Sequence, residues 1–224
     1  DELRPVMNGI FFDIATGKTT LVATDAHRLV RLVNNTVSAA EPVSFILPKK
    51  PAGLLKNVLA KVESDVTITF GVKNARFVFG NTTLVCRQIE GRFPNYNAVI
   101  PQNNTNIAVI DKQTLIAACK RVAVFANTST SLLKLSLSEN RLNISAQDID
   151  FSTSAEETIA CAYEGTPLSI GFKAPFLIDI LGVIGSQDVK LQLADSARAG
   201  LILPTENEEN EELLMLLMPM LLND

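Results

Sequence analysis

The feature that most constrains the fold is an internal repeat. The order strand, helix, strand begins at Val43, with a helical stripe near Leu54 and a strand at Val66. The same order returns from Leu168, with a helical stripe at Leu177. Repeated units of one strand, one helix and three strands predict an α+β fold, in which two helices per domain pack on antiparallel sheets.

Counting the units predicts two domains, residues 1–101 and 102–224. The second contains two complete units, and the first contains one complete unit after three lone strands at 5–37. The strand and helix that should precede those strands are missing, so the count predicts a chain that lacks the start of its first domain. The Asn-rich connector at 101–106 marks the predicted boundary.

Hydrophobic periodicity gives the expected elements. Strands are predicted at 6–14, 20–23, 28–33, 43–47, 66–70, 75–79, 83–88, 107–110, 132–137, 141–146, 158–163, 168–172, 189–193, 200–203 and 213–218. A helix is predicted from Pro51, with an apolar stripe of Leu54, Leu55, Val58, Leu59 and Val62. Two more are predicted, one capped by Asp111 and one at 175–184.

The charge is unevenly distributed between the two halves. Residues 1–101 carry 12 Lys and Arg against 8 Asp and Glu, a balance of +4, and residues 102–224 carry 8 against 16, a balance of −8. The acidic run at 206–212 is typical of a solvated loop. A net acidic chain is not an obvious nucleic-acid binder, but a basic face on an acidic body remains open.

The three cysteines, Cys86, Cys119 and Cys161, lie far apart without a Cys-x-x-Cys motif. An odd count at this spacing argues against a disulfide framework, and a single histidine argues against a zinc site. No apolar run approaches the ~20 residues that span a bilayer. We therefore predict reduced thiols, no metal, no cofactor and a cytoplasmic protein.

The stretch Thr24-Asp25-Ala26-His27-Arg28-Leu29 holds the single histidine at the end of a predicted strand. One reading is enzymatic, with Asp25 orienting His27 as a general base. The other is structural, with Asp25 and Arg28 fixing a turn. No nucleophile, metal site or cofactor motif accompanies the histidine, so the sequence favours the turn.

The repeat, the stretch at 24–29, the motif Gly91-Arg92-Phe93-Pro94-Asn95-Tyr96 and the tail Met218-Pro219-Met220 together resemble the bacterial DNA polymerase III β subunit family of sliding clamps. The resemblance covers the whole chain and implies most of a second domain and a complete third domain. It also implies a non-catalytic protein of the polymerase complex, which forms a head-to-tail homodimeric ring around duplex DNA. A protein-interaction scaffold without a DNA role remains the alternative.

The resemblance implies three sets of functional residues. Helices line the hole of the ring, and the residues expected to face DNA are Lys49, Lys50, Lys56, Lys61, Lys112, Lys120 and Arg121. The dimer interface is expected to include Val124 and Phe125. The third set forms an apolar groove between the second and third domains: Met7, Thr24, His27, Arg28, Leu29, Pro94, Ala98, Val99, Lys173, Phe176, Ala197, Ala199, Met218, Pro219, Met220 and Leu222.

The implied partners of the groove are short peptides of the polymerase III catalytic subunit, a clamp-loader subunit, other polymerases and repair proteins. Methionines suit a surface that accepts several peptides. Two positions depart from commoner family members, because Leu221 and Ala98 stand where arginine is frequent. The groove is therefore expected to be less basic here.

Overall fold

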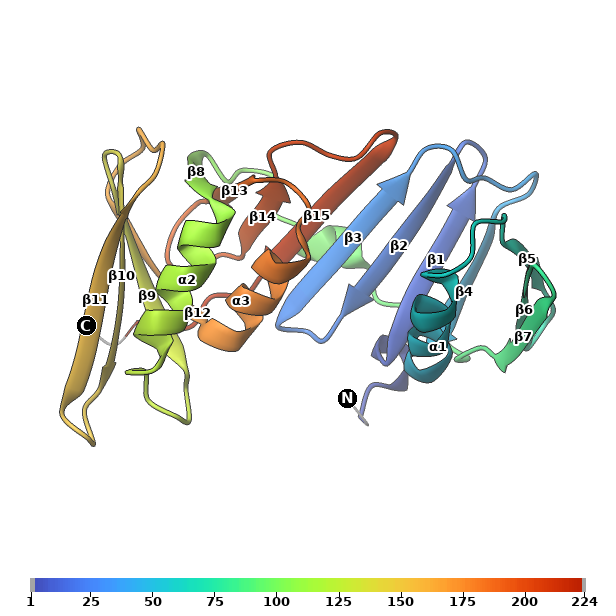
Figure 1. Ribbon diagram of the computed structural model, residues 1–224, viewed down its shortest axis with the longest axis horizontal. Helices are drawn as coiled ribbons and strands as arrows, with labels where there is room; N and C mark the ends of the chain where they lie inside the picture. The colour runs from blue at the N-terminus through green and yellow to red at the C-terminus, as the bar shows by residue number, and fades with distance from the viewer. Residues whose placement is uncertain (1–2, 223–224) are drawn as a thin grey trace. The chain divides into compact units, whose positions relative to one another are not determined.

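The computed structural model describes residues 3–222, which fold into two compact units (Figure 1). The first unit holds residues up to 26 and 30–96, and the second holds 27–29 and the residues from 97 onward. No helix within the described residues is long and apolar enough to cross a bilayer.

The first unit contains two antiparallel sheets and one helix. Its elements are η1 (Pro5–Met7), β1 (Gly9–Ala15), β2 (Lys18–Thr24), β3 (Arg28–Asn34), β4 (Val43–Pro48), α1 (Lys49–Leu59), β5 (Thr67–Phe70), β6 (Asn74–Phe79) and β7 (Thr82–Arg87). The strands run in the orders β4-β1-β2-β3 and β5-β6-β7. The first two residues of β3 belong to the second unit.

Aromatic side chains form the core of the first unit. The Phe45 ring lies 4.6 Å from the rings of both Phe12 and Phe70, and Phe77 and Leu55 are buried in the same cluster. The cluster thus joins β1 and β4 to the three-stranded sheet through one face of α1. Burial of these large rings supplies the main driving force for this unit.

The second unit contains both complete repeats. Its elements are β8 (Asn106–Asp111), α2 (Lys112–Ala123), β9 (Leu132–Ser138), β10 (Arg141–Asp148), β11 (Thr153–Ala160), β12 (Leu168–Lys173), α3 (Ala174–Val183), β13 (Asp188–Leu193), β14 (Gly200–Pro204) and β15 (Glu211–Leu217), preceded by η2 (Tyr96–Val99). The strands run β11-β10-β9-β12 and β15-β14-β13-β8. Helix α2 contacts α3, and the two helices are drawn side by side in Figure 1.

The repeats interlock by exchanging their first strands. Strand β8 precedes α2 but pairs with β13, and β12 precedes α3 but pairs with β9. In the first unit β4 likewise pairs with β1, which belongs to the preceding set of three strands. Because each sheet takes strands from two repeats, a single repeat could not satisfy its own sheet edges.

The repeat order and the α+β class predicted from sequence are confirmed. The cap is also confirmed, since the Asp111 carboxylate accepts the Thr114 N–H at 2.7 Å. All three cysteines are free thiols, with Cys119 and Cys161 buried.

Three element boundaries were wrong. Residues 6–8 form the end of a 3-10 turn instead of a strand, and α1 begins at Lys49, two residues before Pro51. The strand predicted at 158–163 lies at 153–160, paired residue for residue with β10. Its first half is polar, so hydrophobic periodicity gave no signal there, and the register of the hairpin decides its position.

The predicted apolar stripe of α1 was partly wrong. Leu55 is buried, but Leu54 and Val58 are 49% and 39% exposed. Helix α1 covers the sheet with a narrower face than the sequence indicates, because its neighbours β1 and β4 contact it on one side only.

Candidate functional site

The best-defined surface of the second unit is formed by α3, the turn at 27–29 and the C-terminal tail. Phe176 and Asp179 are three residues apart, which places them on one face of α3, and Lys173 is the residue just before the helix. Arg28 reaches this face from the turn. Its guanidinium carbon lies 4.5 Å from the centroid of the Phe176 ring, and its Nη1 lies 3.0 Å from Oδ2 of Asp179.

His27 lies beside the same ring, at 6.0 Å between centroids. Its backbone carbonyl accepts the N–H of Met218 at 2.8 Å, which attaches the start of the tail to the turn. The positive φ of Ala26 (72°) allows the chain to turn sharply just before His27. His27 is thus placed by a backbone hydrogen bond and an aromatic neighbour.

The tail continues along strand β12. The Met220 N–H donates to the Gly171 carbonyl at 2.8 Å, as an isolated antiparallel bridge. A Cβ at position 171 would lie 2.8 Å from the Met220 oxygen and 2.9 Å from a Leu222 methyl group, so this approach depends on glycine. Leu222 then lines a hollow of about 780 Å³, together with Leu132 and Lys134.

We call this region the tail surface, and it comprises His27, Arg28, Lys173, Phe176, Met218, Pro219 and Met220. Met218 is 42% exposed, whereas Leu214 to Leu217 just before it are buried. The tail therefore changes from core strand to accessible apolar surface at Met218. An accessible apolar patch rimmed by polar residues is typical of an interaction site.

The other residues predicted for the groove have different surroundings. Ala98 and Val99 are exposed on η2, and Ala197 is exposed in the loop after β13. Leu29 and Ala199 are buried. Met7, Thr24 and Pro94 belong to the first unit, where the Thr24 hydroxyl accepts the N–H of Ala26.

Asp179 was not predicted from the sequence, although its ion pair with Arg28 orients the guanidinium over Phe176. The pair is largely solvent-exposed, so its contribution to stability is on the order of 0–1 kcal/mol. Its effect is geometric, because it restricts the rotamers of Arg28.

The residues predicted to face DNA fall into two groups. Lys49, Lys50, Lys56, Lys61 and Lys120 are exposed. Lys112, in contrast, donates its Nζ to the Ile184 carbonyl at the end of α3 (2.6 Å), and Arg121 forms two hydrogen bonds with the Glu157 carboxylate (2.9 and 2.6 Å). The hydrogen bonds from Arg121 hold the pKa of the Glu157 carboxyl below its usual range.

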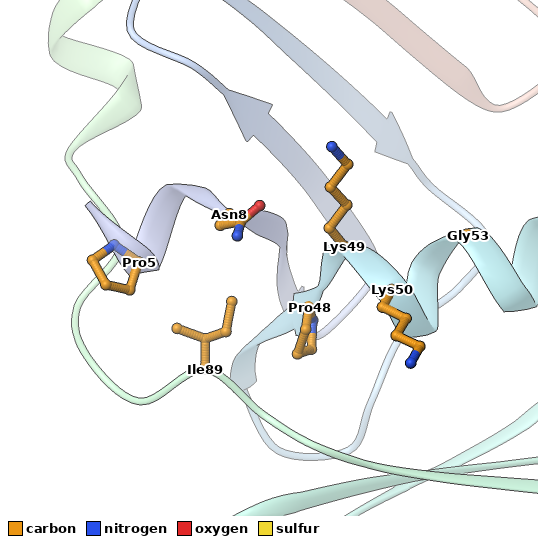
Figure 2. A pocket seen from close by; sticks show the side chains of 7 residues that line it. All are labelled: Pro5, Asn8, Pro48, Lys49, Lys50, Gly53 and Ile89. Carbon is orange, nitrogen blue, oxygen red and sulfur yellow. The ribbon is translucent and has the colours of Figure 1, made fainter. Parts of the chain in front are cut away.

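Lys49 and Lys50 occupy the first turn of α1, beside a hollow of about 650 Å³ that Pro5, Asn8 and Ile89 also line (Figure 2). Their ammonium groups point in different directions (Figure 2). Cations at a helix N-terminus oppose the helix dipole, and no acidic residue offsets them there. Helix stability therefore does not explain two lysines at this position.

Within residues 3–222 no group of three His, Cys, Asp or Glu side chains is arranged to hold a metal ion.

Similarity to known proteins defines the class of this fold. Solved structures of DNA polymerase sliding clamps match it closely. One from Pseudomonas aeruginosa has a TM-score of 0.92 and 31% identity, covering 98% of this chain and 59% of that chain. Another from the same organism, bound to griselimycin, has a TM-score of 0.93 at 30% identity over 99% of this chain and 59% of that chain.

The family follows from the sequence. The family model for the "DNA polymerase III beta subunit, central domain" matches residues 1–95. The family model for the "DNA polymerase III beta subunit, C-terminal domain" matches residues 97–220. The chain belongs to the DNA polymerase III beta subunit family. The beta sliding clamp of Pseudomonas aeruginosa is 31% identical over 215 residues, 96% of this chain and 58% of that protein. The chain thus spans somewhat more than half the length of the curated relatives it matches.

Proposed function

We propose that this chain is the part of a bacterial sliding clamp that binds partner peptides and lines part of a DNA-encircling ring. The observation that carries the proposal is the two-unit fold, with its TM-score of 0.92 to a DNA polymerase sliding clamp. In this role the protein has no chemistry of its own, works in the cytoplasm and tethers the replicative polymerase to duplex DNA. The boundary between its central and C-terminal domains is assigned to residues 96–101.

The DNA-facing surface is proposed to include Lys49, Lys50, Lys56, Lys61 and Lys120. A clamp that slides needs contacts to phosphates without contacts to base edges. The ammonium groups of Lys49 and Lys50 point in different directions. This suits contacts to separate phosphates. Lys112 and Arg121 are assigned a smaller share, because both already bond to protein oxygens.

The test of this surface is a charge-reversal triple, Lys49→Glu, Lys50→Glu and Lys56→Glu, in a protein of the relatives' full length. Retention on circular DNA is expected to fall, and the dependence of binding on salt to flatten, because counterion release scales with the phosphates neutralised. The matched control reverses the exposed cations Lys18, Lys73 and Arg76, with the same change in net charge.

Equal losses in the two triples would mean that only net charge matters, and the lysines of α1 would not face DNA. No retention of the unsubstituted protein on circular DNA would favour the scaffold without a DNA role.

The peptide-binding site is proposed to be the tail surface. Met218 and Met220 are its flexible apolar side chains, and Phe176 with its cations forms the neighbouring wall. The partners are short peptides of the polymerase catalytic subunit, a clamp-loader subunit and repair proteins. A few buried side chains dominate the affinity of small interfaces, so the methionines are expected to dominate here.

Calorimetric titration with a peptide of the type Gln-Leu-x-Leu-Phe tests this proposal on the 224-residue chain. Fully burying one such side chain contributes roughly 1.5–3 kcal/mol. The pair Met218→Ala and Met220→Ala should therefore cost ~3 kcal/mol, about a hundredfold in affinity. Leu221→Ala is the matched control, because Leu221 is 83% exposed beside them. Equal binding by the pair and the control would place the site elsewhere.

A further inference from the structure

The cations around Phe176 differ in how their charge is balanced. The Lys173 ammonium lies 5.2 Å from the ring centroid and the Arg28 guanidinium 4.5 Å from it. Arg28 is ion-paired with Asp179 at 3.0 Å. Lys173 is the last residue of β12, and Asp179 follows six residues later in α3. Among the described residues Asp179 forms its ion pair with Arg28 and not with Lys173.

Lys173 has no carboxylate partner among residues 3–222, and its side chain is half-buried against the ring. A ring face attracts an ammonium group but carries no net charge to neutralise it. Partial burial also removes some of the water that would otherwise solvate the charge, which strengthens its attraction for an incoming anion. Lys173 is therefore a cation whose counter-charge is not supplied locally.

The neighbouring positions add no further positive charge. Ala98 and Leu221 are exposed and neutral, and Met218, Pro219 and Met220 are apolar. A ligand that packs an apolar group on Phe176 and the methionines would thus meet one unbalanced cation at the edge of that contact.

We propose that Lys173 is a specificity-determining residue of the tail surface. It selects peptides that carry a carboxylate directly beside the apolar residue that packs against Phe176. The inference rests on the proposed peptide-binding function and adds the charge of the partner to it. The peptide carboxylate neutralises the Lys173 ammonium, as Asp179 neutralises the Arg28 guanidinium. It does so through a charge-assisted hydrogen bond at a partly desolvated site.

The experiment uses two matched pairs of peptides that differ only in charge. One pair is Gln-Leu-Asp-Leu-Phe with Gln-Leu-Asn-Leu-Phe, and the other is Gln-Leu-Ser-Leu-Phe-Asp with Gln-Leu-Ser-Leu-Phe-Asn, all with blocked termini. Each is titrated against the 224-residue chain and against Lys173→Met, which keeps the apolar stem and removes the charge. Lys120→Met removes the same charge from α2 and is the control.

The unsubstituted chain is expected to bind the acidic member of at least one pair about fivefold more tightly at low salt. That preference should shrink as salt rises to about 0.15 M or beyond, because mobile ions screen the pair. Lys173→Met should abolish the preference, so that the acid and amide members of each pair bind this variant with equal affinity. Lys120→Met should retain it.

Equal binding of acid and amide peptides by the unsubstituted chain would overturn the role of Lys173 and leave the peptide site intact. A preference that survives in Lys173→Met would assign the selection to another group and overturn it as well. If no peptide binds the unsubstituted chain, the tail surface is not the peptide site, and the role of Lys173 is refuted together with it.

Discussion

Asp111 shows how one side chain both ends a strand and begins a helix. Its carboxylate accepts the Thr114 N–H at 2.7 Å. Hydrogen bonds from the Thr114 hydroxyl and then from the Thr114 N–H hold the pKa of Asp111 below its ordinary value of 3.8. Because the folded pKa is the lower one, the cap contributes fully above about pH 3.8 and is lost as the pH falls through the folded pKa.

Circular dichroism melts between pH 7 and pH 2 should reveal this contribution. Asp111→Asn keeps an oxygen acceptor without the charge, so its melting temperature should fall less steeply than that of the unsubstituted chain below about pH 4. Asp111→Ala removes the acceptor and should be less stable at every pH. Parallel pH profiles for all three proteins would show that the cap does not contribute.

Residue positions on the tail surface were predictable only in part. The resemblance named Arg28, Lys173 and Phe176, and their proximity in the structure agrees with a shared surface, while their role in peptide binding stays a prediction. Asp179 was missed because helical spacing alone cannot say which exposed face of α3 meets another segment. Contacts made across 151 residues of sequence are not encoded in any local pattern.

Helix α1 provides the clearest test at the scale of a single element. Leu55 is buried in the core cluster, and the adjacent Leu54 is 49% exposed. Leu55→Ala should lower the free energy of unfolding by about 2–5 kcal/mol, since it leaves a cavity among aromatic side chains. Leu54→Ala should change it by about 0.5 kcal/mol or less. Urea denaturation of the two variants measures the difference.

The order of the elements could be read from the sequence, whereas their edges could not. Apolar alternation located β9, β10 and β13, because each buries one face. The first half of strand β11 was missed, because β11 lies at the edge of its sheet and begins with small polar and acidic residues. The start of α1 was predicted at Pro51, because proline is favoured at the first position of a helix, whereas the helix begins at Lys49.

At the scale of the whole molecule, the apolar end of α2 bears on assembly. Val124 is 78% exposed and Phe125 is 40% exposed. We propose both as part of a dimer interface. A closed ring needs two different faces on each protomer. The family models that match this chain describe the central and C-terminal domains.

The 224-residue chain is therefore expected to sediment as a monomer of 24.3 kDa, or as a dimer that does not form the closed ring. In a protein of the relatives' full length, Val124→Glu should weaken dimerisation, because it places a charge in an apolar contact. Analytical ultracentrifugation of both lengths measures this. A closed two-subunit ring formed by the 224-residue chain would contradict the expectation.

The number of repeats predicted the two-unit organisation, but not which residues each unit contains. The predicted boundary lies at 101/102, whereas the compact units meet at 96/97. Residues 27–29 belong to the second unit although they lie in the first quarter of the chain. No composition shift marks them, since their assignment follows from contacts with the tail and α3.

This membership of residues 27–29 sets a limit on how the gene can be divided. A cut between codons 96 and 97 respects the compactness of both parts, yet it removes from the second part the carbonyl that holds Met218 and the guanidinium that pairs with Asp179. Recombination at this boundary would therefore transfer a tail surface that lacks His27 and Arg28. A recombinant protein would keep these contacts of the second unit only if it also kept the turn at residues 27–29.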